Sequence, residues 1–185
     1  MLSVTKKGMV ISVKKTYVMP LVVLTLICLV VSGALAFMDS ITSPVIAEAA
    51  AIRAQEAMIK IIPEAEGFEP IDLSNVDGLP ASIREIYNTT NDIGYIIIAA
   101  VNGFSGDITV ICGIAPDGTI IESATLSHTE TKGIGTILEE ESFLGPFGGL
   151  DENLEGIDTI AGATISTRAY IHAINDIFEA FRRVS

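Results

Sequence analysis

A long uncharged stretch stands out near the start of the chain. Residues 17–37 read YVMPLVVLTLICLVVSGALAF, 21 positions without a charged side chain. An α-helix needs roughly 20 apolar residues to cross the hydrocarbon core of a bilayer. Pro20 lies near the start of the stretch, where a helix tolerates proline best. The pattern therefore predicts a transmembrane helix over residues 17–37.

The charges ahead of this stretch predict its orientation. Residues 1–16 contain four basic residues and no acidic one: Lys6, Lys7, Lys14 and Lys15. Basic flanks stay in the cytoplasm, so this tail is expected inside and the main domain outside the cell membrane. The alternative is a cleaved secretory signal, because Ala34-Leu35-Ala36 resembles a cleavage site. The apolar core is longer than the roughly 7–15 residues typical of a signal, which favours a retained anchor.

Residues 38–69 are expected to form a helical stalk. Ser43 suits an N-cap and Pro44 suits the first helical position. A separate helix is therefore predicted over residues 45–62, ended by Pro63. Breaking residues are frequent over 64–91, so loops with one short strand or turn are expected there.

Alternating apolar positions predict a β-rich region downstream. Residues 94–101 (GYIIIAAV) form an apolar strand, and residues 107–115 follow a glycine-rich turn. A third strand covers residues 119–127 after the turn Pro116-Asp117-Gly118. Ile108, Val110, Cys112 and Ile114 are expected on one face of the second strand, and Ile120, Ala124 and Leu126 on one face of the third. Short connections imply antiparallel pairing in a meander.

Helical spacing returns at the end of the chain. Residues 166–183 carry an apolar stripe of Tyr170, Ile174, Ile177, Phe178 and Phe181. We interpret this stripe as core. The predicted fold class is α+β: one N-terminal transmembrane helix, then an extracytoplasmic domain over residues 70–185 with an antiparallel sheet and flanking helices.

Charge narrows the classes of function. All 23 acidic residues follow the uncharged stretch, with only seven of the eleven Lys and Arg, so that part carries a formal charge of −16. This argues against binding nucleic acid, which needs basic patches. A metal site is not expected either, because the chain has only two histidines and His172 falls on the terminal helix.

A turn of small residues precedes that helix and offers chemistry. Residues 158–168 read DTIAGATISTR. Gly162 and Ala163 let backbone N–H groups approach an anion, and a helix N-terminus adds free N–H groups and partial positive charge. Hydroxyls and one cation stand nearby: Thr164, Ser166, Thr167 and Arg168. From residue types alone, an ordinary helix start with Ser166 as N-cap is favoured over a phosphate site.

The same turn resembles the flavinylation motif of FMN-binding domains. The run Asp158-x-x-Ala161-Gly162-Ala163-Thr164 matches a pattern that reads Asp-x-x-Ser/Thr-Gly-Ala-Thr/Ser. In that family a flavin transferase joins FMN through a phosphoester to the final hydroxyl residue. The resemblance implies Thr164 as the attachment residue and Asp158 as part of what the transferase recognises. Ala161 departs from the family pattern.

A second segment strengthens the resemblance. His128-x-Glu130-Thr131-x-Gly133-Ile134-Gly135-Thr136 is similar to the family's His-x-Glu-Thr-Pro-Gly-Leu-Gly, with Lys132 in place of proline. Together with the N-terminal span and the run Gly103-Phe104-Ser105-Gly106, the order of motifs resembles the G subunits of Rnf complexes. These complexes are ion-translocating ferredoxin:NAD oxidoreductases.

The resemblance implies a membrane-anchored flavoprotein subunit that relays electrons through covalent FMN and has no independent catalysis. Its expected partners are the other membrane subunits, a flavin transferase and the lipid bilayer. Expected cofactor-binding residues are Gly162, Ala163, Ser166, Thr167 and Arg168 around the phosphate, and His128, Glu130, Thr131, Gly133, Gly135 and Thr136 in the loop.

Two alternatives stay open. One is a subunit of the sodium-pumping NADH:quinone reductase, whose C subunit is a relative, or a stand-alone extracytoplasmic flavin carrier. The other is a non-redox anchored module that binds a partner or a phosphorylated ligand through the Gly162 turn.

Overall fold

The computed structural model describes residues 5–133 and 135–185, and it divides into two compact units, Met1–Ala50 and Ala51–Ser185. The side chains of residues 5–17, which include the four lysines of the expected tail, the side chain of Asn75 and all of Ile134 lie outside the described part. The boundaries predicted for tail, span, stalk and domain therefore remain predictions.

The N-terminal element is a continuous helix, α1 (Thr5–Ile61). Over the predicted span its apolar side chains are exposed, Leu29 for example at 68%. One helix in the described part, Val18–Ile61, is thus long and apolar enough to cross a membrane. Such a surface suits a lipid environment rather than water.

The predicted break at Ser43 and Pro44 is wrong, because α1 runs through it. Pro44 removes only one backbone donor. The hydroxyls of Ser40 and Thr42 donate back to the carbonyls of Phe37 and Met38, at 2.7 and 3.0 Å, as such residues do inside helices. The chain therefore continues as helix where the sequence suggested a new start.

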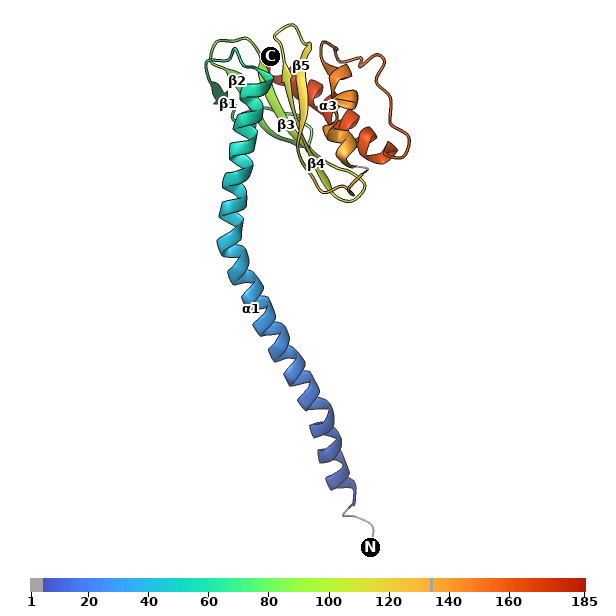
Figure 1. Ribbon diagram of the computed structural model, residues 1–185. Helices are drawn as coiled ribbons and strands as arrows, with labels where there is room; N and C mark the ends of the chain where they lie inside the picture. The colour runs from blue at the N-terminus through green and yellow to red at the C-terminus, as the bar shows by residue number, and fades with distance from the viewer. Residues whose placement is uncertain (1–4, 134) are drawn as a thin grey trace. The chain divides into compact units, whose positions relative to one another are not determined.

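The second unit is built on a five-stranded antiparallel sheet in the order β1-β2-β3-β4-β5 (Figure 1). The strands are β1 (Phe68–Pro70), β2 (Ile83–Thr89), β3 (Tyr95–Asn102), β4 (Asp107–Ile114) and β5 (Ile120–His128). The predicted meander of β3 to β5 is confirmed. Upstream of β3 the sequence predicted one short strand or turn, whereas the structure has two strands, β1 and β2. The apolar alternation of β2 is hidden because the strand is half-exposed and its register shifts at Ile83/Glu85.

The two faces of the sheet bury different sets of residues. Ile108, Val110, Cys112 and Ile114 share the inner face as predicted. The prediction for β5 is wrong, because Ile120 packs on the inner face whereas Ala124 and Leu126 pack on the outer one. A register shift at Gly113/Ile114 inserts Ile121 as an extra residue, and one extra residue reverses the side-chain alternation.

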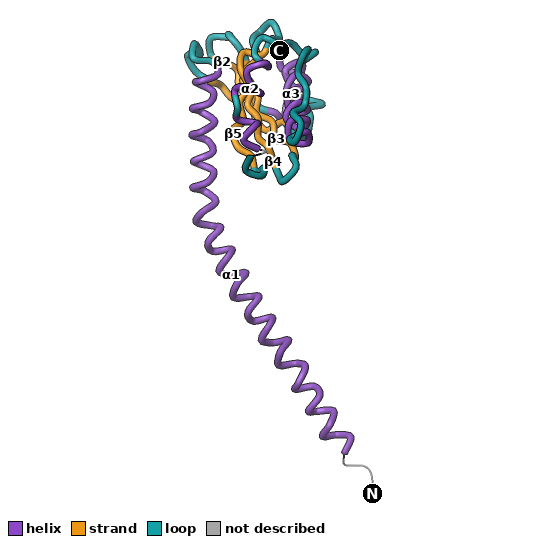
Figure 2. The backbone as a smooth tube through the Cα atoms, turned by 45° about the vertical axis from the view of Figure 1, so that its right-hand side comes forward, coloured by secondary structure: helices purple, strands orange, loops and turns teal. Residues whose placement is uncertain are grey.

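Helices cover the inner face. α3 (Thr164–Val184) lies along the strands (Figure 2), and the predicted stripe from Tyr170 to Phe181 is buried in the core. Short helices after β5 complete the layer: η2 (Gly135–Glu139), α2 (Glu141–Leu144) and η3 (Gly145–Phe147). On the outer face, Met58, Ile61 and Ile62 pack with Ile96, Ile98 and Ile111. Before Ile83 the chain also forms η1 (Leu73–Asn75).

Candidate functional site

Three segments that are distant in sequence meet beside the start of α3. They are the turn between β3 and β4, the loop after β5, and the turn that leads into α3. Glu130 joins them, since one carboxylate oxygen accepts from the N–H groups of Phe104 and Ser105 at 2.8 and 3.0 Å. The other oxygen accepts from the Ser166 hydroxyl at 2.5 Å. Both segments flagged in the sequence therefore belong to one site.

Glu130 is buried and charged. Only 7% of the surface of Glu130 is exposed to solvent. Desolvation raises the pKa of the carboxyl, but hydrogen bonds from Ser166, Ser105, Phe104 and Gly106 together outweigh desolvation and hold the pKa below its ordinary value. Glu130 is thus an anion at neutral pH, stabilised by neutral donors.

His128 orders the loop in which Glu130 lies. Its Nδ1 accepts from the backbone N–H of Glu130 at 3.3 Å, and its Nε2 lies 3.2 Å from Oε1 of Glu139. This network assigns the proton to Nε2, because Nδ1 is used as an acceptor. His128 therefore fixes the backbone at Glu130 and is anchored in turn by Glu139.

The turn before α3 is held by its own backbone and by Thr167. Gly162 has a φ of 90°, a conformation that suits glycine. Ala163 N donates to Ile160 O at 3.0 Å, and Ile160 N donates to the Thr167 hydroxyl at 3.2 Å. Thr167 is fully buried and donates back to Ala163 O at 3.0 Å, so its hydroxyl braces the turn.

The first turn of α3 is open to an anion. Its N-cap is Ala163, whose side chain makes no capping hydrogen bond. The predicted N-cap role of Ser166 is wrong, because the helix begins two residues earlier and Ser166 points its hydroxyl at Glu130. An uncapped helix N-terminus keeps free N–H donors and partial positive charge.

A pocket of about 260 Å³ lies at this helix start. It is lined by Phe104, Gly162, Ala163, Thr164, Ile165 and Ser166. Phe104 and Ile165 are 63% and 54% exposed, unusual for large apolar side chains. Thr164 is half-buried between these apolar surfaces, and its hydroxyl donates to Ile160 O at a long 3.4 Å. The site thus combines an apolar platform, a hydroxyl and a helix N-terminus.

Phe104 and Ile165 are site residues that sequence reasoning missed. Phe104 belongs to the glycine-bounded run from 103 to 106, and an aromatic residue in such a turn is a usable signal. Ile165 follows Thr164 directly but gives no signal of its own, since its exposure is decided by the packing of α3.

The other predicted site residues are distributed around this pocket. Gly135 is buried against Glu130 and His128, and a Cβ added there would lie closer than 3.0 Å to Glu130 Cβ. Thr131 is exposed, with its hydroxyl 3.2 Å from that of Ser105. Asp158 is exposed and accepts from Thr159 N at 2.6 Å. Gly133, Thr136 and Arg168 are exposed too, and like Thr131 and Asp158 they do not line the pocket.

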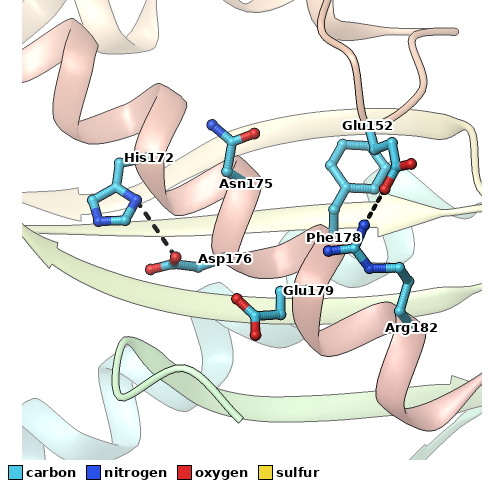
Figure 3. Close-up of a pocket in the computed structure, with 7 residues that line it drawn as sticks. All are labelled: Glu152, His172, Asn175, Asp176, Phe178, Glu179 and Arg182. Atoms are coloured by element: carbon cyan, nitrogen blue, oxygen red, sulfur yellow. Dashed lines mark hydrogen bonds and ion pairs between the residues drawn. The ribbon is translucent and has the colours of Figure 1, made fainter. Parts of the chain in front are cut away.

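A second pocket, of about 240 Å³, lies on the outer side of α3 (Figure 3). Here His172 lies 3.4 Å from Asp176, and Arg182 pairs with Glu152. With Glu179, three carboxylates face one guanidinium and one imidazole. This charge balance disfavours a phosphate.

Within residues 5–133 and 135–185, no cluster of His, Cys, Asp and Glu suits a metal ion.

Comparison with known proteins agrees with this geometry. The FMN-binding domain family matches residues 103–179, which include all three segments of the site. The G subunit of the ion-translocating oxidoreductase complex of Methanosarcina acetivorans is 33% identical over 133 residues, covering 65% of this chain and 71% of the relative. The G subunit of the proton-translocating ferredoxin:NAD(+) oxidoreductase complex of Clostridium ljungdahlii is 26% identical, over 84% of this chain and 86% of the relative.

A third relative is the G subunit of the Na(+)-translocating ferredoxin:NAD(+) oxidoreductase complex of Acetobacterium woodii. It is 24% identical over 88% of this chain and 90% of its own length. The longer alignments span part of the apolar helix as well as the sheet domain. The chain therefore belongs to the family of G subunits of ion-translocating oxidoreductase complexes and contains that family's FMN-binding domain.

Proposed function

We propose that this protein is the membrane-anchored flavoprotein subunit of an ion-translocating ferredoxin:NAD oxidoreductase and that it relays electrons through FMN bound covalently to Thr164. The observation that carries the proposal is the position of Thr164. It is the hydroxyl residue at an uncapped helix start, in a pocket walled by exposed apolar side chains, within the matched FMN-binding domain.

The residues present fit an FMN group. The free N–H groups at the start of α3 suit a phosphate, and Gly162, at a φ of 90° with nothing within 4 Å of an added Cβ, leaves the approach open. Arg168 stands one helical turn after Thr164 and is exposed, so its guanidinium is available to a dianion. Phe104 and Ile165 offer apolar surface for the flavin ring system.

FMN, when bound, supplies the electron chemistry, because no side chain of the protein accepts and passes on single electrons as a flavin does. The protein's part is to hold and orient. Thr164 Oγ1 is the proposed ester oxygen between the side chain and the FMN phosphate. A covalent tether keeps the cofactor on the protein in every redox state. Glu130 holds the turn that carries Phe104.

The assembly and the orientation complete the proposal. The relatives are named as subunits of complexes, so we expect neighbouring membrane subunits as electron donor and acceptor. The basic residues ahead of the apolar helix support a cytoplasmic N-terminus and an extracytoplasmic FMN domain. The exposed Asp158 is accessible to a flavin transferase. The membrane anchor is α1.

The attachment is tested by a pair of substitutions at residue 164. The chain is co-expressed with a flavin transferase, and denatured protein is examined for flavin fluorescence on a gel. Thr164→Val keeps the shape of the side chain and removes the hydroxyl, so the signal should fall at least tenfold. Thr164→Ser keeps a hydroxyl and should retain it.

Peptide mass spectrometry of residues 158–168 locates the modification independently. A flavin-bearing peptide is expected from the wild type and from Thr164→Ser. Covalent flavin that persists in Thr164→Val would place the bond elsewhere, and its absence from the wild type in the presence of the transferase would refute the tether.

A further inference from the structure

The contacts of Glu130 connect two parts of the pocket that are far apart in the chain. Phe104 lies in the turn between β3 and β4, and Thr164 begins α3. Oε1 of Glu130 receives the backbone N–H groups of Phe104 and Ser105, and Oε2 receives the hydroxyl of Ser166. A single carboxylate therefore bonds the wall of the pocket on one side and the helix that carries the proposed tether on the other.

Glu130 lies close to two glycines from different segments. A Cβ on Gly103 would lie closer than 3.0 Å to Glu130 Oε1, and a Cβ on Gly135 would lie closer than 3.0 Å to Glu130 Cβ. Contacts this short are not tolerated by real Cβ atoms. A side chain at either position would therefore have to displace Glu130, through its carboxylate end at residue 103 and through its Cβ at residue 135.

Glu130 is held by several donors acting together. Among the ion pairs of the described residues none includes Glu130. A buried carboxylate that lacks a cation depends on its hydrogen bonds, so each one matters for the geometry of the others. The N-terminal end of α3 adds favourable partial charge near Ser166.

We propose that Glu130 is a positioning residue and not a flavin ligand: its carboxylate fastens the Phe104 turn to the first turn of α3, so that Phe104 and Thr164 are held in fixed relation across the pocket. The role in flavin binding rests on the proposed function above. The mechanical link itself rests on the hydrogen bonds alone. Glu130 acts on the cofactor through Phe104 and Ser166, whose contacts set the shape of the pocket.

The link is tested by hydrogen exchange on the full chain in detergent, made without a flavin transferase. The substitution Ser166→Ala removes one hydroxyl from α3, and the readout is the peptide that contains Phe104 and Ser105, about 60 residues away in the chain. If Glu130 couples the two segments, exchange at that turn should rise severalfold. Glu130→Ala should raise it tenfold or more, the scale expected when hydrogen bonds to a charged acceptor are lost.

Two further variants separate coupling from general damage. Glu130→Gln keeps an oxygen for the two N–H groups and an amide for Ser166, so its exchange should lie between those of the wild type and Glu130→Ala. Ser82→Ala removes a hydroxyl that donates to the Asp176 carboxylate at 2.6 Å, a serine–carboxylate hydrogen bond to a different part of α3, and should leave the Phe104 turn unchanged. Unchanged exchange in Ser166→Ala, or an equal rise in Ser82→Ala, would overturn the link.

The effect of the link on flavin binding is measured in protein that carries flavin. At equal loading, Ser166→Ala should weaken the visible circular dichroism of the flavin, because the ring loses a fixed wall. Ser82→Ala, which removes a hydroxyl bonded to Asp176 away from the pocket, should not. Loosened exchange with unchanged dichroism would refute the effect on the flavin. A chain that carries no flavin would refute the proposed function and would leave the exchange result standing.

Discussion

At the scale of single residues, the start of α3 separates two roles between neighbouring hydroxyls. Thr164 lines the pocket and is half-buried, with only a long hydrogen bond to Ile160 O. Ser166 is 1% exposed and donates to Glu130. The hydroxyl that we propose as the flavin attachment point and the hydroxyl that supports the site are therefore two positions apart on one helix.

Glu130 should make the stability of the domain depend on acid pH. Its pKa in the folded protein lies below its ordinary value of 4.5, so the folded state binds that proton less readily than the unfolded chain does. The stabilisation is therefore fully present above pH 4.5 and is lost as pH falls through the lower, folded pKa. In Glu130→Gln the side chain at residue 130 does not titrate, so this contribution to stability is absent.

The measurement compares the free energy of unfolding of the wild type and Glu130→Gln from about pH 7 to about pH 3, a window that spans the titration of carboxyl groups. The other carboxyl groups titrate in both proteins, so the difference between the two isolates residue 130. That difference should shrink as pH falls below 4.5. A difference that stays constant across the range would mean that the carboxylate contributes no pH-dependent stability.

At the scale of elements, the loop from β5 to η2 depends on two glycines for different reasons. Gly133 has a φ of 91° and open space around it, whereas Gly135 lies against Glu130 and His128. One glycine serves the backbone conformation and the other serves close packing.

Alanine at each position should separate these effects. Gly133→Ala should lower the free energy of unfolding by about 1–2 kcal/mol, the cost of a left-handed conformation for a residue with a Cβ. Gly135→Ala should cost about 1–3 kcal/mol through overpacking and should also displace Glu130.

Hydrogen exchange at the turn of residues 103–106 reports that displacement. It should rise in Gly135→Ala and stay near the wild-type rate in Gly133→Ala, with denaturant unfolding of each variant as the check on stability. Equal exchange in the two variants would show that Gly135 does not serve the position of Glu130.

At the scale of the whole molecule, the apolar N-terminal helix and the acidic sheet domain are suited to different environments. The exposed apolar side chains of α1 suit lipid, and the formal charge of −16 after residue 37 suits water. The proposed membrane insertion places the apolar helix in lipid and the acidic domain in water outside the cell. It also leaves the basic residues of the tail in the cytoplasm.

Cysteine labelling tests this orientation. Cys112 is fully buried, so a Cys28→Ala background with Glu155→Cys presents one exposed thiol on the domain. A membrane-impermeant maleimide should label it in intact spheroplasts, whereas a Ser3→Cys control should react only after permeabilisation. Labelling in the reverse order would show that the domain lies in the cytoplasm.

Local pattern was sufficient for much of this protein. Short-range pattern, which the sequence displays directly, predicts four elements. They are the apolar run of residues 17–37, the apolar run of β3, the alternation of β4 and the stripe of α3. The motif resemblance likewise pointed to Thr164 and the loop around Glu130, because a reactive site constrains the residue types beside it.

Tertiary structure decided the rest. The bulge at Ile121 that reverses β5, and the continuation of α1 through Pro44, arise from pairing and backbone bonding that no local pattern displays. Ser166 looked like a helix cap and became a donor to Glu130 only because folding brings together residues 36 positions apart. The sequence by itself thus determined which segments carry the candidate site. The fold determined which residues face the pocket and which hold it in shape, since that choice depends on contacts between distant segments.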